Sequence, residues 1–105
     1  MTEVTVLLLD GTFASTAIGP MEVFRHAGVL WSFLTQQRPA PRFRVTTASA
    51  DGRPVCCDGH IDVRPQASIV AIRKTDLVFV PTTGLNLNHV DRIYAPVIPW
   101  AAALA

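Results

Sequence analysis

The chain has 105 residues, which is enough for one domain, and its formal net charge at pH 7 is +1. Half of the residues are hydrophobic and only 16% are charged, so the sequence predicts more apolar surface than a small globule can bury. The basic residues are scattered, which argues against nucleic-acid binding by this stretch, and no apolar run approaches the roughly 20 residues of a membrane span. We therefore expect no association with a membrane.

The two cysteines of the sequence, Cys56 and Cys57, are neighbours. Adjacent residues rarely form a disulfide, because the geometry of that bond is demanding. A chain without a disulfide framework is typical of a reducing compartment, so we expect a cytoplasmic protein. The pair could act as nucleophiles or sense oxidants, but Asp58 beside it favours the protonated thiol, and we predict buried, unreactive cysteines.

The first elements are a strand and a helix. Val4–Leu9 is a nearly continuous apolar run, typical of a strand buried on both faces. Ser15 or Thr16 can cap the helix that follows, with Pro20 in its first turn, and apolar residues recur at helical spacing to about residue 36. Gly28 makes a break in this helix possible.

Two further strands are predicted, at Phe43–Ala48 and Asp76–Pro81. Between them Asp51-Gly52 predicts a turn, and Val55–Asp58 and Ile61–Arg64 read as short extended pieces around a glycine. The remaining predictions are a loop and helical turn over 65–72, a short helix from an Asn88 cap to Tyr94, and the start of a helix at Pro99.

Strands that alternate with helices predict βαβ units and a parallel sheet. In such sheets the ligand site lies beyond the carboxyl ends of the strands. Any site should therefore gather from Asp10–Thr16, Ser49–Gly52 and Pro81–Asn86.

Few residues in these segments carry an evident chemistry. Glu22 lies about one turn into the predicted helix, where the helix dipole would stabilise a carboxylate, or it could point into the cleft as an acid, base or ligand anchor. The three histidines have no metal-ligand spacing, and neither a phosphate-binding glycine pattern nor a serine nucleophile elbow occurs. We expect no metal and no cofactor, and the residues by themselves predict a site without a reaction.

The stretch Gly19-Pro20-Met21-Glu22-Val23-Phe24, which follows Val6–Gly11, resembles the opening of the ThiJ/PfpI superfamily, and most closely that of GlxA-type regulators of the AraC family. The order of Phe43–Val45, Ser49–Val55 and Asp76–Pro81 is similar too, so the resemblance covers essentially the whole chain. It implies a doubly wound, flavodoxin-like three-layer α/β sandwich, usually dimeric and related to class I glutamine amidotransferases.

Enzymes of the superfamily use a cysteine on a strand-to-helix elbow and an acid from the region of the first helix. The elbow strand would follow Leu104, so we expect residues 1–105 to be the N-terminal portion of a single ThiJ/PfpI-like domain, truncated before the nucleophile. By motif order Thr16 takes the position of the acid, and Pro81-Thr82-Thr83-Gly84 replaces the usual Pro-Gly-Gly. Both departures favour the regulator branch, without catalytic residues in this chain.

The resemblance thus implies part of a ligand-sensing and dimerisation domain of an AraC-type transcription regulator, a homodimer that binds DNA only through a C-terminal region absent from this chain. Its unknown small-molecule ligand would contact Asp10, Thr16, Glu22, Thr82, Thr83 and Gly84. The alternative is a ThiJ/PfpI-like cysteine hydrolase, hydratase or amidase whose nucleophile lies beyond residue 105. A third possibility is an unrelated flavodoxin-like binding module.

Overall fold

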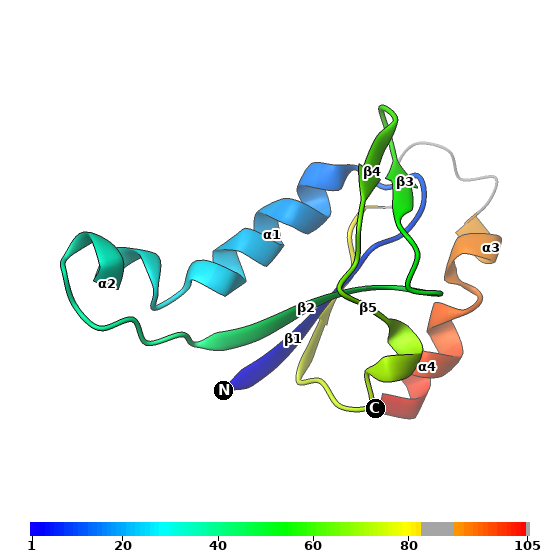
Figure 1. Ribbon diagram of the computed structural model, residues 1–105. Helices are drawn as coiled ribbons and strands as arrows, with labels where there is room; N and C mark the ends of the chain where they lie inside the picture. The colour runs from blue at the N-terminus through cyan, green and yellow to red at the C-terminus, as the bar shows by residue number, and fades with distance from the viewer. Residues whose placement is uncertain (83–89, 105) are drawn as a thin grey trace.

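The computed structural model describes residues 1–82 and 90–104. Its centre is a four-stranded sheet in the order β5-β2-β1-β6, in which every pair is parallel (Figure 1). The strands are β1 (Thr2–Leu7), β2 (Phe43–Ser49), β5 (Ala67–Ser68) and β6 (Leu77–Phe79). The three predicted strands are confirmed, and β5 is an addition within the segment predicted to be a loop and helical turn.

Strand β1 is the most deeply buried part of the chain because it lies between β2 and β6. Val4 is in register with Val45 of β2 on one side and with Leu77 of β6 on the other. Val4 and Val6 are almost completely buried, as is Leu7, whose side chain points to the opposite face. The prediction of a strand buried on both faces is therefore confirmed.

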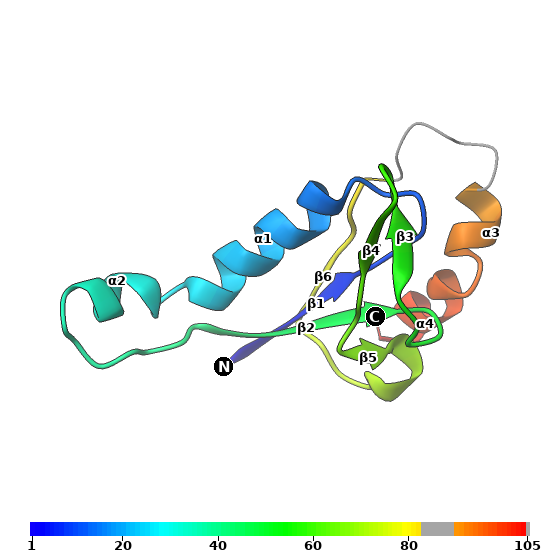
Figure 2. The same cartoon turned by 45° about the horizontal axis from the view of Figure 1, so that its top comes forward.

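Helix α1 (Ala14–His26) covers one face of the sheet (Figures 1 and 2). It packs on the even-numbered residues of the first strand region, together with apolar residues of the hairpin described below: the buried cluster is Val4, Val6, Leu8, Ala17, Val55 and Cys57. The ring of Phe24 lies edge-on to that of Phe43, with the centroids 5.1 Å apart. Phe79 of β6 makes a similar contact at 6.5 Å, so one helical residue joins two strands.

The opposite face is covered by α3 (Val90–Tyr94), α4 (Val97–Leu104) and the 3-10 helix η1 (Ile69–Ala71). The buried residues here are Leu7, Leu9, Ala48, Ile69 and Val97. The indole Nε1 of Trp100 donates a hydrogen bond of 3.0 Å to the carbonyl of Ile72, which fixes α4 beside η1. Helices on both faces make three layers, as predicted. Helix α4 begins two residues before Pro99, which a first turn tolerates.

The start of α1 differs from the prediction. The N-cap residue is Phe13, and no side chain caps the helix. Ser15 and Thr16 lie in the first turn instead, where the Thr16 hydroxyl donates to the carbonyl of Phe13 at 2.7 Å. Pro20 consequently lies inside the helix rather than in its first turn, and the carbonyl of Thr16 receives no N–H from it.

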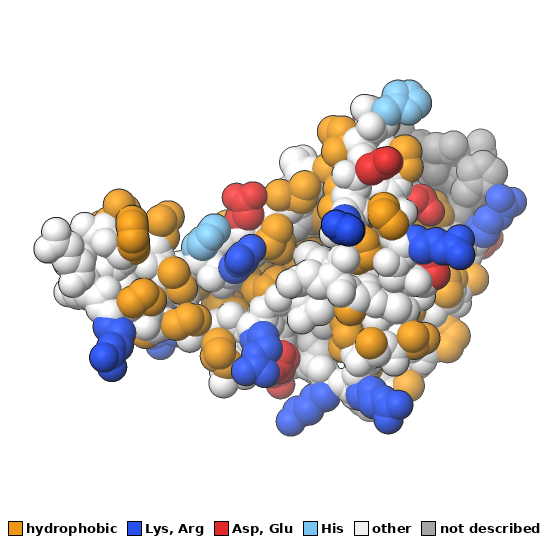
Figure 3. All heavy atoms as spheres, viewed as in Figure 1, with side chains coloured by type: hydrophobic (Ala, Val, Ile, Leu, Met, Phe, Trp, Pro, Cys, Tyr) orange, Lys and Arg blue, Asp and Glu red, His pale blue; other side chains and the backbone are white. Residues whose placement is uncertain are grey.

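The predicted break at Gly28 is confirmed. Helix α1 ends at His26, Gly28 has a φ of +79°, and the chain resumes as α2 (Leu30–Leu34), which projects away from the sheet (Figure 1). All the large apolar side chains of α2 are exposed: Leu30, Trp31, Phe33 and Leu34. Hydrophobic side chains gather at this end of the molecule in Figure 3, as the composition predicted.

The two short extended pieces form an antiparallel hairpin of β3 (Val55–Cys57) and β4 (Ile61–Val63), with Gly59 at its tip. The turn at Asp51-Gly52 is also confirmed: Gly52 has a φ of +79°, and Asp51 Oδ1 accepts a hydrogen bond of 3.0 Å from the N–H of Arg53. In the part of the chain that the structure describes, no helix has the length and apolar character required to cross a membrane.

Candidate ligand site at the carboxyl ends of the strands

Three hydrogen bonds donated by backbone N–H groups join the loop after β1 to the hairpin. The N–H of Gly11 donates to the carbonyl of Cys56 at 2.9 Å, and the N–H of Asp58 donates to the carbonyl of Thr12 at the same distance. The carboxylate of Asp10 accepts the third, from the N–H of Cys56 at 3.0 Å. Asp10 therefore holds the hairpin over the carboxyl end of the sheet, and one of its oxygens is already engaged.

The loop after β6 reaches the same edge through Thr82. Its backbone N–H donates a hydrogen bond of 3.1 Å to the hydroxyl oxygen of Thr16. Because that hydroxyl also donates to the carbonyl of Phe13, it links the loop after β6 to the first turn of α1. These two predicted site residues are in direct contact.

Two buried hydroxyl groups donate hydrogen bonds to carbonyl groups of the loops after β1 and β2. Thr12 donates to the carbonyl of Leu9 at 2.8 Å, and its oxygen lies 3.7 Å from the sulfur of Cys57. Ser49 donates to the carbonyl of Arg53 at 2.8 Å and so holds the loop after β2. Both residues are about 1% exposed, so they belong chiefly to the framework of this edge.

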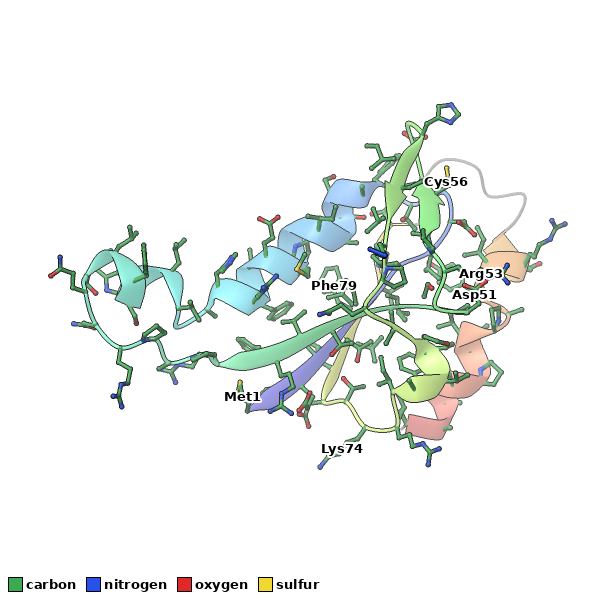
Figure 4. All side chains as sticks on the ribbon, viewed as in Figure 1. Met1, Asp51, Arg53, Cys56, Lys74 and Phe79 are labelled. Carbon is green, nitrogen blue, oxygen red and sulfur yellow. The ribbon has the colours of Figure 1, made fainter. Side chains whose placement is uncertain are left out.

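A pocket of about 270 Å³ opens at this edge, between the loop after β2 and α3. Charges of both signs line it: the aspartates Asp10 and Asp51 and the arginines Arg53 and Arg92. In Figure 4, Asp51 and Arg53 lie on the loop that faces α3. Apart from Ser49, the rest of the lining is apolar.

The cysteines differ from each other, which corrects the prediction that both are buried. Cys57 is buried, whereas Cys56 is exposed. The pKa of the Cys56 thiol is nevertheless raised, by desolvation first and then by the charge and hydrogen bonding of Asp62 and by the charge of Asp10. The neutral thiol is therefore the favoured form of an accessible cysteine, and Asp62, rather than the predicted Asp58, is the main acidic neighbour.

The structure separates Glu22 from the other predicted site residues. Helix α1 begins at Ala14, so Glu22 lies more than two turns along it and is exposed to solvent. The predicted interaction with the positive end of the helix dipole is wrong for this reason, because that interaction fades beyond the first turn. Asp10, Thr16 and Thr82 do lie at the carboxyl edge, whereas Thr83 and Gly84 fall outside the described residues.

Metal-ligating side chains are not clustered in the described ranges. No group of three or more His, Cys, Asp or Glu side chains there could hold a metal ion. His26 and His60 are exposed, and His89 lies outside the described residues.

Four residues of the edge were not singled out from the sequence: Thr12, Ser49, Arg53 and Arg92. Thr12 and Ser49 lie in segments predicted to border the site, and Arg53 directly follows the predicted Asp51-Gly52 turn, so the sequence already indicated the positions of these three residues. Arg92 lies on a helix 39 residues further along, and only the packing of α3 beside the loop after β2 brings it to the pocket.

The fold and this edge define the class of protein: a three-layer α/β domain with a parallel sheet and a pocket of about 270 Å³ at the carboxyl ends of its strands. The sequence matches no family model and no curated protein. Solved structures do match.

Three of them illustrate the range. A candidate transcriptional regulator from Vibrio parahaemolyticus is 20% identical, with a TM-score of 0.72, and the match covers 98% of this chain and 50% of that one. An AraC family transcriptional regulator from Pseudomonas putida is 21% identical, with a TM-score of 0.56 over 99% of this chain and 54% of that one. A ThiJ/PfpI family protein from Pseudomonas syringae is 16% identical, with a TM-score of 0.61 over 98% and 39%.

The chain thus has the flavodoxin-like fold of the matched parts of these proteins, among which are AraC-family and ThiJ/PfpI proteins, as the resemblance in the sequence implies. It spans about half the length of the two regulators and less of the third protein.

Proposed function

We propose that the chain is the N-terminal portion of the ligand-sensing and dimerisation domain of an AraC-type transcription regulator. The observation that carries the proposal is the environment of Thr16, which by motif order takes the position of the acid in ThiJ/PfpI enzymes. Its hydroxyl is bonded to the carbonyl of Phe13 and the N–H of Thr82. A neutral hydroxyl occupied in this way holds two loops together and supplies no carboxylate chemistry.

The ligand would bind at the carboxyl edge, in contact with Asp10 and near the Thr16–Thr82 link. The pocket there has two aspartates and two arginines, and these groups favour a small polar molecule. Movement of such a ligand against the loop after β6 would be transmitted to α1 through the Thr16 hydroxyl. The proposed ligand residues are therefore Asp10, Thr16 and Thr82, with Thr83 and Gly84 next in the chain.

In this proposal the protein is a cytoplasmic homodimer. DNA would be bound by a C-terminal region, because the net charge of this chain is only +1. The match of this chain to about half of each regulator is compatible with further sequence that completes the domain.

The second candidate is a ThiJ/PfpI-like cysteine hydrolase, hydratase or amidase. Its support is the likeness to the ThiJ/PfpI protein from Pseudomonas syringae. The nucleophile would be a cysteine beyond residue 105, since Cys57 is buried and the pKa of the Cys56 thiol is raised.

DNA binding by the full-length protein separates the two functions. Fluorescence anisotropy with labelled fragments from upstream of its own gene should show specific binding that weakens as salt rises. A complete gene product without a helix-turn-helix region would contradict the regulator. A thiol beyond residue 105 that titrates well below its ordinary pKa of about 8.5 would favour the enzyme.

A further inference from the structure

A larger groove lies on the α1 side of the sheet, toward the amino ends of β1 and β2 and away from the carboxyl edge. Its volume is about 720 Å³, within the range of roughly 300–1,000 Å³ that is usual for small-molecule sites. Helix α1, β2 and the end of β4 form its walls. The apolar lining includes Ala17, Ile18, Met21, Phe43, Val45 and Val63.

The ionisable side chains around this groove are all basic. Arg25 and His26 come from α1 and Arg44 from β2, while Arg64 directly follows β4, and no Asp or Glu is among the lining residues that the structure describes. In Figure 3, basic side chains lie among hydrophobic ones on this face, with acidic side chains nearby.

Few of these charges are neutralised. Among the residues that the structure describes, the one ion pair is that of Arg44 with Glu3, at 3.1 Å. The sequence also has no acidic residue from position 23 to position 50, which spans the end of α1 and all of β2. An apolar cleft with an unbalanced positive rim attracts anions and retains those that carry an apolar body.

We infer that this groove binds a small amphipathic monoanion, such as a medium-chain carboxylate. The apolar body would lie along Met21, Phe43 and Val45. The carboxylate would pair with Arg25 or Arg64, whose guanidinium groups suit bidentate hydrogen bonding. The inference goes beyond the proposed function and does not depend on it, because either a regulator or an enzyme can carry a second ligand site.

Isothermal titration of the full-length protein with decanoate, below the concentration at which decanoate aggregates, tests the inference. We expect one decanoate per protomer, bound at least about tenfold more tightly than 1-decanol and decyltrimethylammonium (~1.4 kcal/mol). The double variant Arg25→Gln/Arg64→Gln should bind decanoate about as weakly as decanol. Arg73→Gln, which removes an exposed arginine that does not line the groove, is the matched control and should leave the affinity unchanged.

A second variant tests the location. Met21→Trp places a larger side chain in the groove and should weaken decanoate and decanol alike, while circular dichroism confirms that the protein remains folded. Equal affinities for decanoate and decanol, an unchanged affinity in the double arginine variant, or many decanoates per protomer would overturn the inference. So would a homodimer that Met21→Trp dissociates without any change in decanoate binding, because the groove would then be a protomer interface. None of these results depends on whether the protein binds DNA.

Discussion

The hydroxyl of Thr16 accepts a hydrogen bond from the backbone N–H of Thr82, although 66 residues separate them in the chain. The same hydroxyl donates to the carbonyl of Phe13, so it occupies both of its hydrogen-bonding roles in joining two loops. This link fixes the distance between the first turn of α1 and the loop after β6. It is the contact through which a ligand at the carboxyl edge would be sensed in the proposed function.

Replacement of Thr16 by valine should destabilise the protein by about 1 kcal/mol, because both hydrogen bonds are lost while the side chain keeps its shape. Urea denaturation measures the loss. Thr16→Ser retains the hydroxyl and is the control, with an expected change in the free energy of unfolding below about 0.5 kcal/mol. Equal stability of the valine and serine variants would show that the link contributes nothing.

Truncation of Leu7 tests whether the central strand is buried on both faces. Its side chain is 1% exposed and packs with Ile69 and Val97, so Leu7→Ala should lower the free energy of unfolding by about 2–5 kcal/mol. Val70 follows Ile69 in η1 but is 76% exposed, and Val70→Ala should change the stability by less than about 0.5 kcal/mol. Chemical denaturation of both variants compares them, and similar losses would contradict the two-sided burial of β1.

The central strand was predictable because a strand buried on both faces needs consecutive apolar residues. Leu8 faces α1 and Leu7 faces η1 and α4, so both faces must be apolar and the run is continuous. The hairpin was predictable for a similar reason, since Gly59 and the turn at Asp51-Gly52 are local signals. By contrast, β5 has only two residues, too few for any pattern, and exists because Ala67 and Ser68 pair with the end of β2.

The location of the candidate site was predictable from the sequence, but only some of its residues were. The carboxyl-end rule correctly located Asp10, Thr16 and Thr82 at one edge. Local preferences assigned Thr16 to a helix cap, yet its hydroxyl is engaged by a residue far along the chain, which no local preference encodes. Arg92 and the basic groove along α1 likewise depend on contacts between distant segments.

Substitution of Gly28 tests the close approach of the chain at the turn between α1 and α2. It has a φ of +79°, and a Cβ at this position would lie 2.0 Å from the carbonyl oxygen of Ala40. Gly59, at the hairpin tip, has a similar φ of +81°, but its nearest heavy atom would be the flexible end of Ile61 at 4.0 Å.

Both alanine variants incur the cost of a left-handed conformation, about 1–2 kcal/mol, and only Gly28→Ala adds a backbone clash. Gly28→Ala should therefore be the less stable of the two by at least about 1 kcal/mol in urea denaturation. If Gly59→Ala were equally damaging, the close approach of Ala40 would not be important.

The two cysteines should differ in their reaction with iodoacetamide, followed by mass spectrometry. Cys57 is buried and should react only when the protein unfolds, whereas Cys56 is exposed. Desolvation and the carboxylates of Asp62 and Asp10 raise the pKa of the Cys56 thiol, so its thiolate fraction at any given pH is lower than that of an ordinary cysteine.

The rate of Cys56 alkylation should accordingly keep rising with pH beyond the range in which a free cysteine levels off. Asp62→Asn removes the nearby negative charge and should lower the pKa of the thiol, which accelerates alkylation at pH 8. Asp58→Asn is the control, because Asp58 adjoins the pair in sequence but is not among the groups that shift this pKa. A larger acceleration in Asp58→Asn than in Asp62→Asn would show that the adjacent carboxylate controls the thiol.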